Sequence, residues 1–228
     1  MKRSEINHEI REAEKMFASF NFQLPKFASY TLEDWKKHGS EIDEILDCEL
    51  GWDITDFGRG DFRKEGLLLF TIRNGKAGSA VYRKSYAEKI MISRSAQVTL
   101  MHCHEAKTED IINRGGGKLI FELFNRKGKS TDLDDTPVEF SWDGEKITLP
   151  AGEKFAISPG ESITLTPNLF HKFYAEKGSE VMIGEVSAVN DDHCDNVFHG
   201  EQLRFPVIEE DVAPYRLLVS DYRNFLKK

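Results

Sequence analysis

The chain has 228 residues, of which 39% are hydrophobic and 11% aromatic, as expected for a globular protein with one substantial core. Its 39 acidic and 31 basic residues give a formal net charge of −8. Nucleic acids and anionic membrane surfaces both require a basic patch on their protein partners, so this charge argues against both kinds of partner.

The first sixty residues are predicted to form a helical lead-in. Thr31–Asp34 resembles a capping box with Asp in place of Glu, and it opens a helix that Gly39 ends. Residues 41–48 add another turn or two. Before them, residues 4–21 form an amphipathic helix with Ser4 as N-cap, whose apolar face consists of Ile6, Ile10, Ala13, Met16, Phe17 and Phe20.

From residue 61 to residue 210 the pattern changes to short strands. Such strands, about ten residues apart and separated by Gly, Pro and Asn turns, predict a sandwich or barrel. Residues 215–226 are predicted to form a closing helix. We therefore expect a single domain over 1–228, with a helical lead-in (1–60), a β-barrel (61–210) and a C-terminal helix (211–228). The predicted strands are 66–73, 86–92, 97–104, 118–124, a hairpin over 140–149, 155–157, 162–165, 171–175 and 181–186.

Three further observations bear on the compartment. The N-terminus lacks the apolar core of a signal peptide, and no apolar stretch approaches transmembrane length. The three cysteines, Cys48, Cys103 and Cys194, are odd in number and match no disulfide framework, which favours a reducing interior. We expect a cytoplasmic protein.

Three histidines and one glutamate form a candidate metal site. His102 and His104 alternate along a predicted strand, so they share one face of it while Cys103 takes the other. Glu109 would point to the opposite face if the same strand continued. The chain must therefore reverse direction after His104 and place Glu109 early on the next strand, where it can face the two histidines. His171 follows a Pro-marked turn on a later strand. Mn, Fe, Ni and Zn accept such ligands, and four protein ligands leave positions open on a metal that favours six.

The spacing of these residues resembles a known family. H-x-H-x4-E over 102–109, and P-G-x4-L-x-P-x3-H ending at His171, resemble the two cupin motifs. The helical lead-in and the segments 109–117 and 184–196 resemble the D-lyxose isomerase family of cupins, over nearly the whole chain. The resemblance implies a mainly β cupin jelly-roll barrel that holds its metal with three His and one Glu. By analogy with other cupins, we also expect a homodimer.

The resemblance also implies an activity. It is the interconversion of D-lyxose and D-xylulose, with some action on D-mannose and D-fructose, through an enediol. A divalent metal, Mn²⁺ by preference, with Zn²⁺, Co²⁺ or Fe²⁺ as alternatives, would act as Lewis acid, and a small sugar would be the partner.

Charged side chains near the expected ligands are candidates for catalysis and sugar binding. Lys107 lies in the turn before Glu109, where burial beside a cation is expected to lower its pKa and suit proton exchange. Glu201 is the candidate general base that pairs with it, although an exposed loop carboxylate would explain the same residue. The candidates for sugar contact are Lys89, Glu185, Arg114 and Asp195.

Two other functions remain open at this point. Cupin dioxygenases hold Fe, Ni or Cu with the same ligands, and a sensor cupin would bind a sugar without converting it. An oxygenase pocket is expected to be largely apolar, whereas the lysines and glutamates named above favour a polyol. Proton transfer and a metal-assisted hydride shift are both compatible with the sequence.

Overall fold

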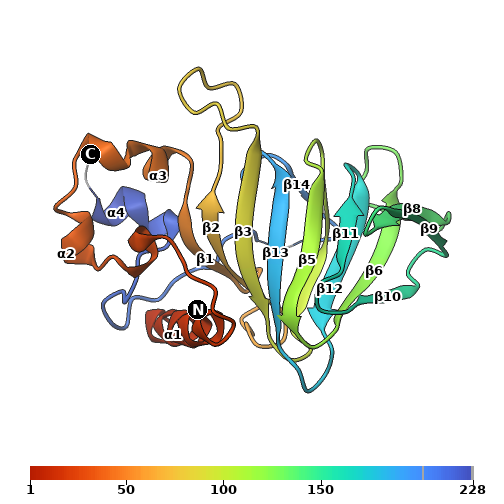
Figure 1. Cartoon of the computed structure of the whole chain (residues 1–228), viewed down its shortest axis with the longest axis horizontal. Helices are drawn as coiled ribbons and strands as arrows, with labels where there is room; N and C mark the ends of the chain where they lie inside the picture. The colour runs from red at the N-terminus through yellow and green to blue at the C-terminus, as the bar shows by residue number, and fades with distance from the viewer. Residues whose placement is uncertain (202, 227–228) are drawn as a thin grey trace.

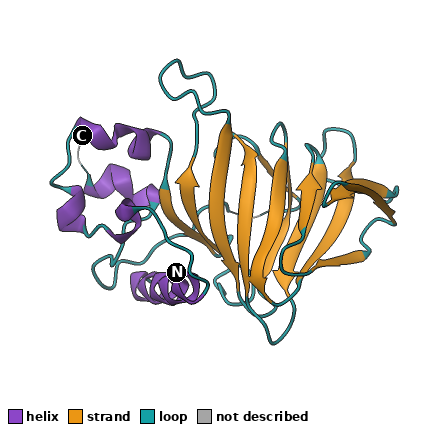
Figure 2. Ribbon diagram, viewed as in Figure 1, coloured by secondary structure: helices purple, strands orange, loops and turns teal. Residues whose placement is uncertain are grey.

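Two antiparallel sheets face each other and form the barrel (Figures 1 and 2). The computed structural model describes residues 1–201 and 203–226. The larger sheet has the order β1-β2-β3-β13-β5-β11-β8-β9 and the smaller one β10-β6-β12-β4-β14, with β7 paired to β6. The strands are β1 (Gly51–Thr55), β2 (Leu67–Arg73), β3 (Tyr86–Ser93), β4 (Val98–His104), β5 (Glu109–Gly116), β6 (Leu119–Arg126), β7 (Leu133–Asp134), β8 (Val138–Trp142), β9 (Glu145–Leu149), β10 (Lys154–Ile157), β11 (Ser162–Leu165), β12 (Leu169–Ala175), β13 (Val181–Ala188) and β14 (Asn196–Phe198).

The helices gather beside β1, at one end of the larger sheet (Figure 2). Thr31 begins a helix with the predicted capping box. No helix among the described residues is long and apolar enough to cross a membrane. The helices are α1 (Arg3–Ser19), η1 (Lys26–Ser29), α2 (Leu32–Trp35), η2 (Ser40–Ile42), α3 (Asp43–Asp47), η3 (Val219–Asp221) and α4 (Tyr222–Phe225). The mainly β barrel with helical segments at both ends is the fold class predicted from the sequence.

Two of the predicted elements need correction. The helical lead-in contains a strand, β1, whose five residues are all buried and pair with β2. The closing helix is shorter than 215–226, because Leu218 is extended and forms a parallel bridge with Trp52 of β1. Only residues 219–225 are helical there. In both places contact with the sheet edge overrides the local helical pattern.

The core has two main parts, one inside the barrel and one outside it. Side chains from both sheets fill the barrel interior, among them Leu69, Ile111, Phe121 and Phe173. On the outer face of β1–β3, the apolar face of α1 packs against a second cluster that includes Trp52 and Phe70. These three strands are therefore covered on both faces, and β2, Leu67–Arg73, accordingly has an apolar run rather than an alternating pattern.

Strand register brings the polar candidates into the barrel. In the smaller sheet, His171 of β12 lies opposite His102 of β4. In the larger sheet, Glu185 of β13 lies opposite Lys89 of β3. Because the sheets face each other, the two polar pairs approach the same part of the barrel interior.

Candidate active site

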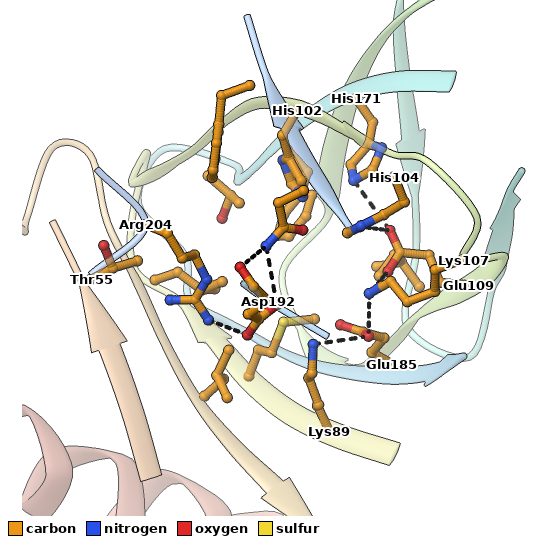
Figure 3. A pocket seen from close by; sticks show the side chains of 18 of the residues that line it. Thr55, Lys89, His102, His104, Lys107, Glu109, His171, Glu185, Asp192 and Arg204 are labelled. Carbon is orange, nitrogen blue, oxygen red and sulfur yellow. Dashed lines mark hydrogen bonds and ion pairs between the residues drawn. The ribbon is translucent and has the colours of Figure 1, made fainter. Parts of the chain in front are cut away.

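The three predicted histidine ligands converge inside the barrel. His102 and His104 share a face of β4, and His171 reaches the same place from the neighbouring strand (Figure 3). Their donor nitrogens all lie within 4.8 Å of one another. Cys103, between the two histidines, is fully buried and is not among the described residues that line this pocket. Strand parity therefore sorted the histidines from the cysteine correctly.

Backbone carbonyls fix how two of these rings are protonated. His102 Nδ1 lies 2.7 Å from the carbonyl oxygen of Leu100, and His171 Nδ1 lies 3.0 Å from that of Leu169. A carbonyl only accepts, so each Nδ1 carries a proton, and Nε2 is the nitrogen of each ring left to bind a cation. His171 Nε2 is buried and has no hydrogen-bond partner among the described residues. Such a nitrogen fits a metal ligand.

Glu109 stands beside this triad. It begins β5, as the parity argument predicted, and its Oε1 lies 3.3 Å from His104 Nε2 and 3.2 Å from His171 Nε2. Burial alone would raise its pKa, but Lys107 and His104 hold the pKa of this carboxyl well below its ordinary value. Three imidazoles and one ionised carboxylate therefore form a donor set that could hold a divalent cation.

The two histidines of β4 differ in charge environment. Burial, together with His171 and His104, holds the pKa of His102 well below its ordinary value, so this ring is neutral. Burial also acts to lower the pKa of His104, but Glu109 and Asp195 together outweigh it and the net shift is upward. Asp195 Oδ2 lies 3.3 Å from His104 Nδ1, and its Oδ1 accepts from the Ala106 amide. Asp195, predicted to contact sugar, thus lies behind His104, within ion-pair distance of its Nδ1.

Two lysines and a glutamate form the opposite wall. Glu185 Oε1 lies 2.9 Å from Lys107 Nζ and 3.2 Å from Lys89 Nζ, and Figure 3 shows both ammonium groups pointing at it. Lys107 also lies 2.7 Å from Glu109 Oε2. Burial acts to lower the pKa of Lys107, but these two carboxylates outweigh it and raise the pKa. This direction is opposite to the one expected from the sequence.

The structure places two predicted site residues elsewhere. Arg114 is exposed on the outer face of β5, where its side chain lies over Gly184. Glu201 is also exposed and lines a separate surface hollow with Phe57 and Leu203. Neither residue is among the described residues that line the histidine pocket. The roles of Arg114 and Glu201 stay predictions, and these positions do not support them.

Arg204, Asp192 and Thr55 are among the polar residues of the pocket to which the sequence reasoning gave no role. Arg204 Nη2 lies 2.6 Å from Asp192 Oδ2 and 2.7 Å from Asp53 Oδ2, on the other side of the pocket from Lys107 (Figure 3). Thr55 of β1 lines the same side. Arg204 is an isolated basic residue in a long loop, and Thr55 lies in the segment predicted to be helical, so neither carried a signal. Asp192 belonged to a quoted family motif.

Relatives of this chain match it over nearly its whole length. The family model described as D-lyxose isomerase matches residues 1–222. A D-lyxose/D-mannose isomerase of Serratia proteamaculans is 46% identical over 228 residues, covering 99% of this chain and all of that protein. The enzyme of the same name from Escherichia coli O157:H7 is 45% identical over 227 residues, with the same coverage.

Solved structures agree on the fold. An Acinetobacter sp. DL28 L-ribose isomerase in complex with L-ribose superposes with a TM-score of 0.57 at 14% identity, covering 88% of this chain and 93% of that chain. The L-ribose isomerase of Cellulomonas parahominis gives 0.54 at 17% identity, with the same coverage.

The chain thus shares its β-barrel fold with L-ribose isomerases, and three of its histidines converge inside the barrel. The chain belongs to the D-lyxose isomerase family. It is accordingly an intramolecular oxidoreductase that interconverts aldose and ketose sugars.

Proposed function

We propose that the protein interconverts D-lyxose and D-xylulose, and D-mannose and D-fructose, at a divalent cation held by His102, His104, Glu109 and His171. The observation that carries this proposal is the convergence of three imidazole donors and a carboxylate opposite Lys107 and Glu185, in one pocket. The substrates come from the names of the two relatives with about half of their residues identical to this chain.

The ligand set supports a cation with open coordination positions. His102 and His171 each leave Nε2 to bind a cation, and Glu109 supplies an anionic oxygen. Mn²⁺ is our first choice, with Zn²⁺, Co²⁺ and Fe²⁺ as alternatives that accept the same donors. When bound, such a cation polarises the sugar carbonyl and stabilises negative charge on the C1 and C2 oxygens.

Glu185 and Lys107 are placed to handle protons. Burial acts to raise the pKa of Glu185, but Lys107 and Lys89 outweigh it and lower the pKa, so the carboxylate is ionised at neutral pH. As base it removes the C2 proton of the aldose while O1 gains a proton, which gives the enediol. The proton then returns to C1, the C2 hydroxyl loses its proton, and the ketose results. The Lys107 ammonium, beside Glu109 and Glu185, donates to the oxygens that carry developing charge.

The remaining wall of the pocket suits a polyol. Arg204, Asp192 and Thr55 line it and offer donors and acceptors to sugar hydroxyls. Arg204 Nη1 is buried with no hydrogen-bond partner among the described residues. We propose that this side of the pocket binds the hydroxyls beyond C2.

The first experiment asks whether the pocket isomerises sugar. The protein is stripped of metal, reloaded separately with Mn²⁺, Zn²⁺, Co²⁺ and Fe²⁺, and incubated with D-lyxose and with D-mannose. We expect D-xylulose and D-fructose from at least one reloaded form, without oxygen uptake, and neither ketose from the stripped protein. A folded, metal-loaded protein that forms no ketose from either sugar would contradict the proposal.

A second experiment separates the two glutamates. Glu185→Gln removes the carboxylate in the pocket, and Glu201→Gln removes the exposed one, with little change in side-chain size. We expect the Glu185 variant to keep its metal and lose at least about a hundredfold in kcat, the lower range for loss of a general base. The Glu201 variant is expected to stay near wild type. A large loss of kcat in Glu201→Gln, with little loss in Glu185→Gln, would instead identify Glu201 as the general base.

A further inference from the structure

The two pocket lysines share a second oxygen besides that of Glu185. Asn190, in the loop after β13, places its Oδ1 2.7 Å from Lys89 Nζ and 3.2 Å from Lys107 Nζ. Both partners only donate, so the oxygen of this amide must face them. Asn190 thus supplies a neutral acceptor between two ammonium groups that would otherwise repel each other.

Asn190 is itself held by another asparagine. Asn74 follows β2 and is 4% exposed. Its Nδ2 donates to the backbone oxygen of Asn190 at 2.9 Å, and its Oδ1 accepts from the backbone amide of Asn190 at 3.0 Å. The same Nδ2 donates to the carbonyl of Cys48 at 3.3 Å. The side chain of Asn74 therefore hydrogen-bonds to both the backbone N–H and the backbone C=O of Asn190, as the backbone of a neighbouring strand would.

This two-point contact fixes the direction of the Asn190 side chain. A loop residue whose N–H and C=O are both paired loses the freedom to rotate about its backbone. The lysine side chains are long and flexible, so the position of each Nζ depends on the acceptors that surround it. Glu185 and Asn190 are acceptors common to Lys89 and Lys107.

We propose that Asn74 is a positioning residue for catalysis, which acts through Asn190. The hydrogen bonds from Asn74 fix the backbone of Asn190 and so hold the Asn190 Oδ1 between the two ammonium groups. This oxygen in turn determines the positions of the Lys107 and Lys89 Nζ atoms in the pocket. The inference rests on the proposed function for its kinetic consequences. Asn74 itself is not among the described residues that line the histidine pocket.

The chain offers a matched control for buried asparagine loss. Asn113 of β5 is fully buried and makes the same kinds of bond to the backbone. Its Nδ2 donates to the carbonyls of Gly117 at 2.9 Å and Ile157 at 3.1 Å, and its Oδ1 accepts from the Gly115 amide at 3.0 Å. None of these partners lines the histidine pocket. Asn113→Ala therefore reports the structural cost alone.

The kinetic experiment is a double-mutant cycle on the metal-loaded protein. We expect Asn190→Ala to lower kcat about tenfold or more, because small misplacements of reacting groups cost up to about a hundredfold. Asn74→Ala should lower kcat in the same direction, with metal content unchanged. If Asn74 acts only through Asn190, the double variant should match Asn190→Ala within about twofold. Asn113→Ala should lower Tm and leave kcat of the folded protein within about twofold of wild type.

If the double variant loses kcat by the product of the two single losses, the inference is overturned. A loss of kcat in Asn113→Ala equal to that in Asn74→Ala would also overturn it. If Asn74→Ala does not fold, Asn74→Asp is used, because it keeps the acceptor for the Asn190 amide and loses both donated bonds.

A crystal structure of the Asn74 variant gives an independent readout. We expect the Asn190 oxygen to leave one or both lysines, and unchanged contacts would contradict us. A wild-type protein that does not isomerise sugar would contradict the proposed function alone. The crystal structure would still show whether Asn74 positions Asn190 and the two lysines.

Discussion

At the scale of single residues, each histidine of the triad is oriented by a specific acceptor. His102 and His171 use the carbonyls two residues before them on their own strands, whereas His104 faces Asp195. The carbonyl contacts are local, so any chain that builds these strands also sets the ring protonation. As the proposed metal ligands, rings held in this way would need little reorganisation to bind a cation.

Removing one ring tests the site directly. His171→Ala should abolish stoichiometric metal binding and isomerisation together, because it deletes one of the three imidazole donors that converge in the pocket. Metal content after dialysis, measured by mass spectrometry, checks the expectation. The control is His8→Ala, which alters an exposed residue of α1. Full metal occupancy in the His171 variant would show that the cation lies elsewhere.

Thiol reactivity tests which way Cys103 points. Burial raises its pKa to about 12, so at pH 8 only about one thiol in ten thousand is ionised. We expect iodoacetamide to modify exposed Cys194 in the native protein and to spare Cys103 and Cys48, which are buried. All three should react after unfolding. Rapid native labelling of Cys103, read by peptide mass spectrometry, would mean that it opens onto the pocket.

Residue-level prediction succeeded where period and parity apply. The alternation His102-Cys103-His104 was enough to choose the inward pair, and parity placed Glu109 on the next strand. Arg204 and Glu201 belong to a loop, where side-chain direction depends on tertiary contacts rather than on a repeat. No local pattern could show that the first faces the pocket and the second faces solvent.

At the scale of elements, one buried arginine joins the two ends of the chain. Arg3 of α1 is fully buried and makes two 2.8 Å bonds to Asp221 of η3. It also bonds to the partly exposed Glu210. These contacts attach α1 to the segment that closes the chain, so the helical side of the molecule depends on them.

Arg3→Met should therefore destabilise the protein strongly. It leaves the buried Asp221 carboxylate without its cation, and breaking a buried pair in this way costs about 3–5 kcal/mol. Urea unfolding measures the loss. The matched control is Lys15→Met, which breaks an exposed pair with Glu12 on the same helix and should leave the stability nearly unchanged. Equal losses in the two variants would contradict this account of the Arg3 contacts.

The same scale shows where sequence patterns misled. The strand β1 was read as part of a helical lead-in, although Trp52–Thr55 alternates apolar and polar residues, because five residues are too few for a clear strand pattern. The closing helix was overextended because Leu217 and Leu218 are apolar at helical spacing with Tyr222. In fact Leu218 is extended and bridges to β1. Both errors arise from pairing with another segment of the chain, β2 in the first case and β1 in the second, which a local pattern does not show.

At the scale of the whole molecule, the barrel brings the proposed ligands together. The histidines come from the smaller sheet and Glu109 from the larger one, and an apolar interior holds the two sheets together. We expect the metal-free protein to keep its near-ultraviolet circular dichroism. Added Mn²⁺ at about a hundred times its dissociation constant should raise the free energy of unfolding by about 2.7 kcal/mol. A stripped protein that loses its tertiary signal would contradict this.

Transfer of a proton between C1 and C2 inside this pocket is the central claim, and its most direct test uses deuterium. The metal-loaded protein is incubated with D-lyxose in heavy water, and the product is followed by proton nuclear magnetic resonance. We predict D-xylulose that carries deuterium at C1, because a proton held by a pocket residue between the two steps exchanges with solvent. Absence of any ketose would contradict the proposed activity. Ketose without deuterium at C1 would contradict the role given to Glu185 and favour a hydride shift.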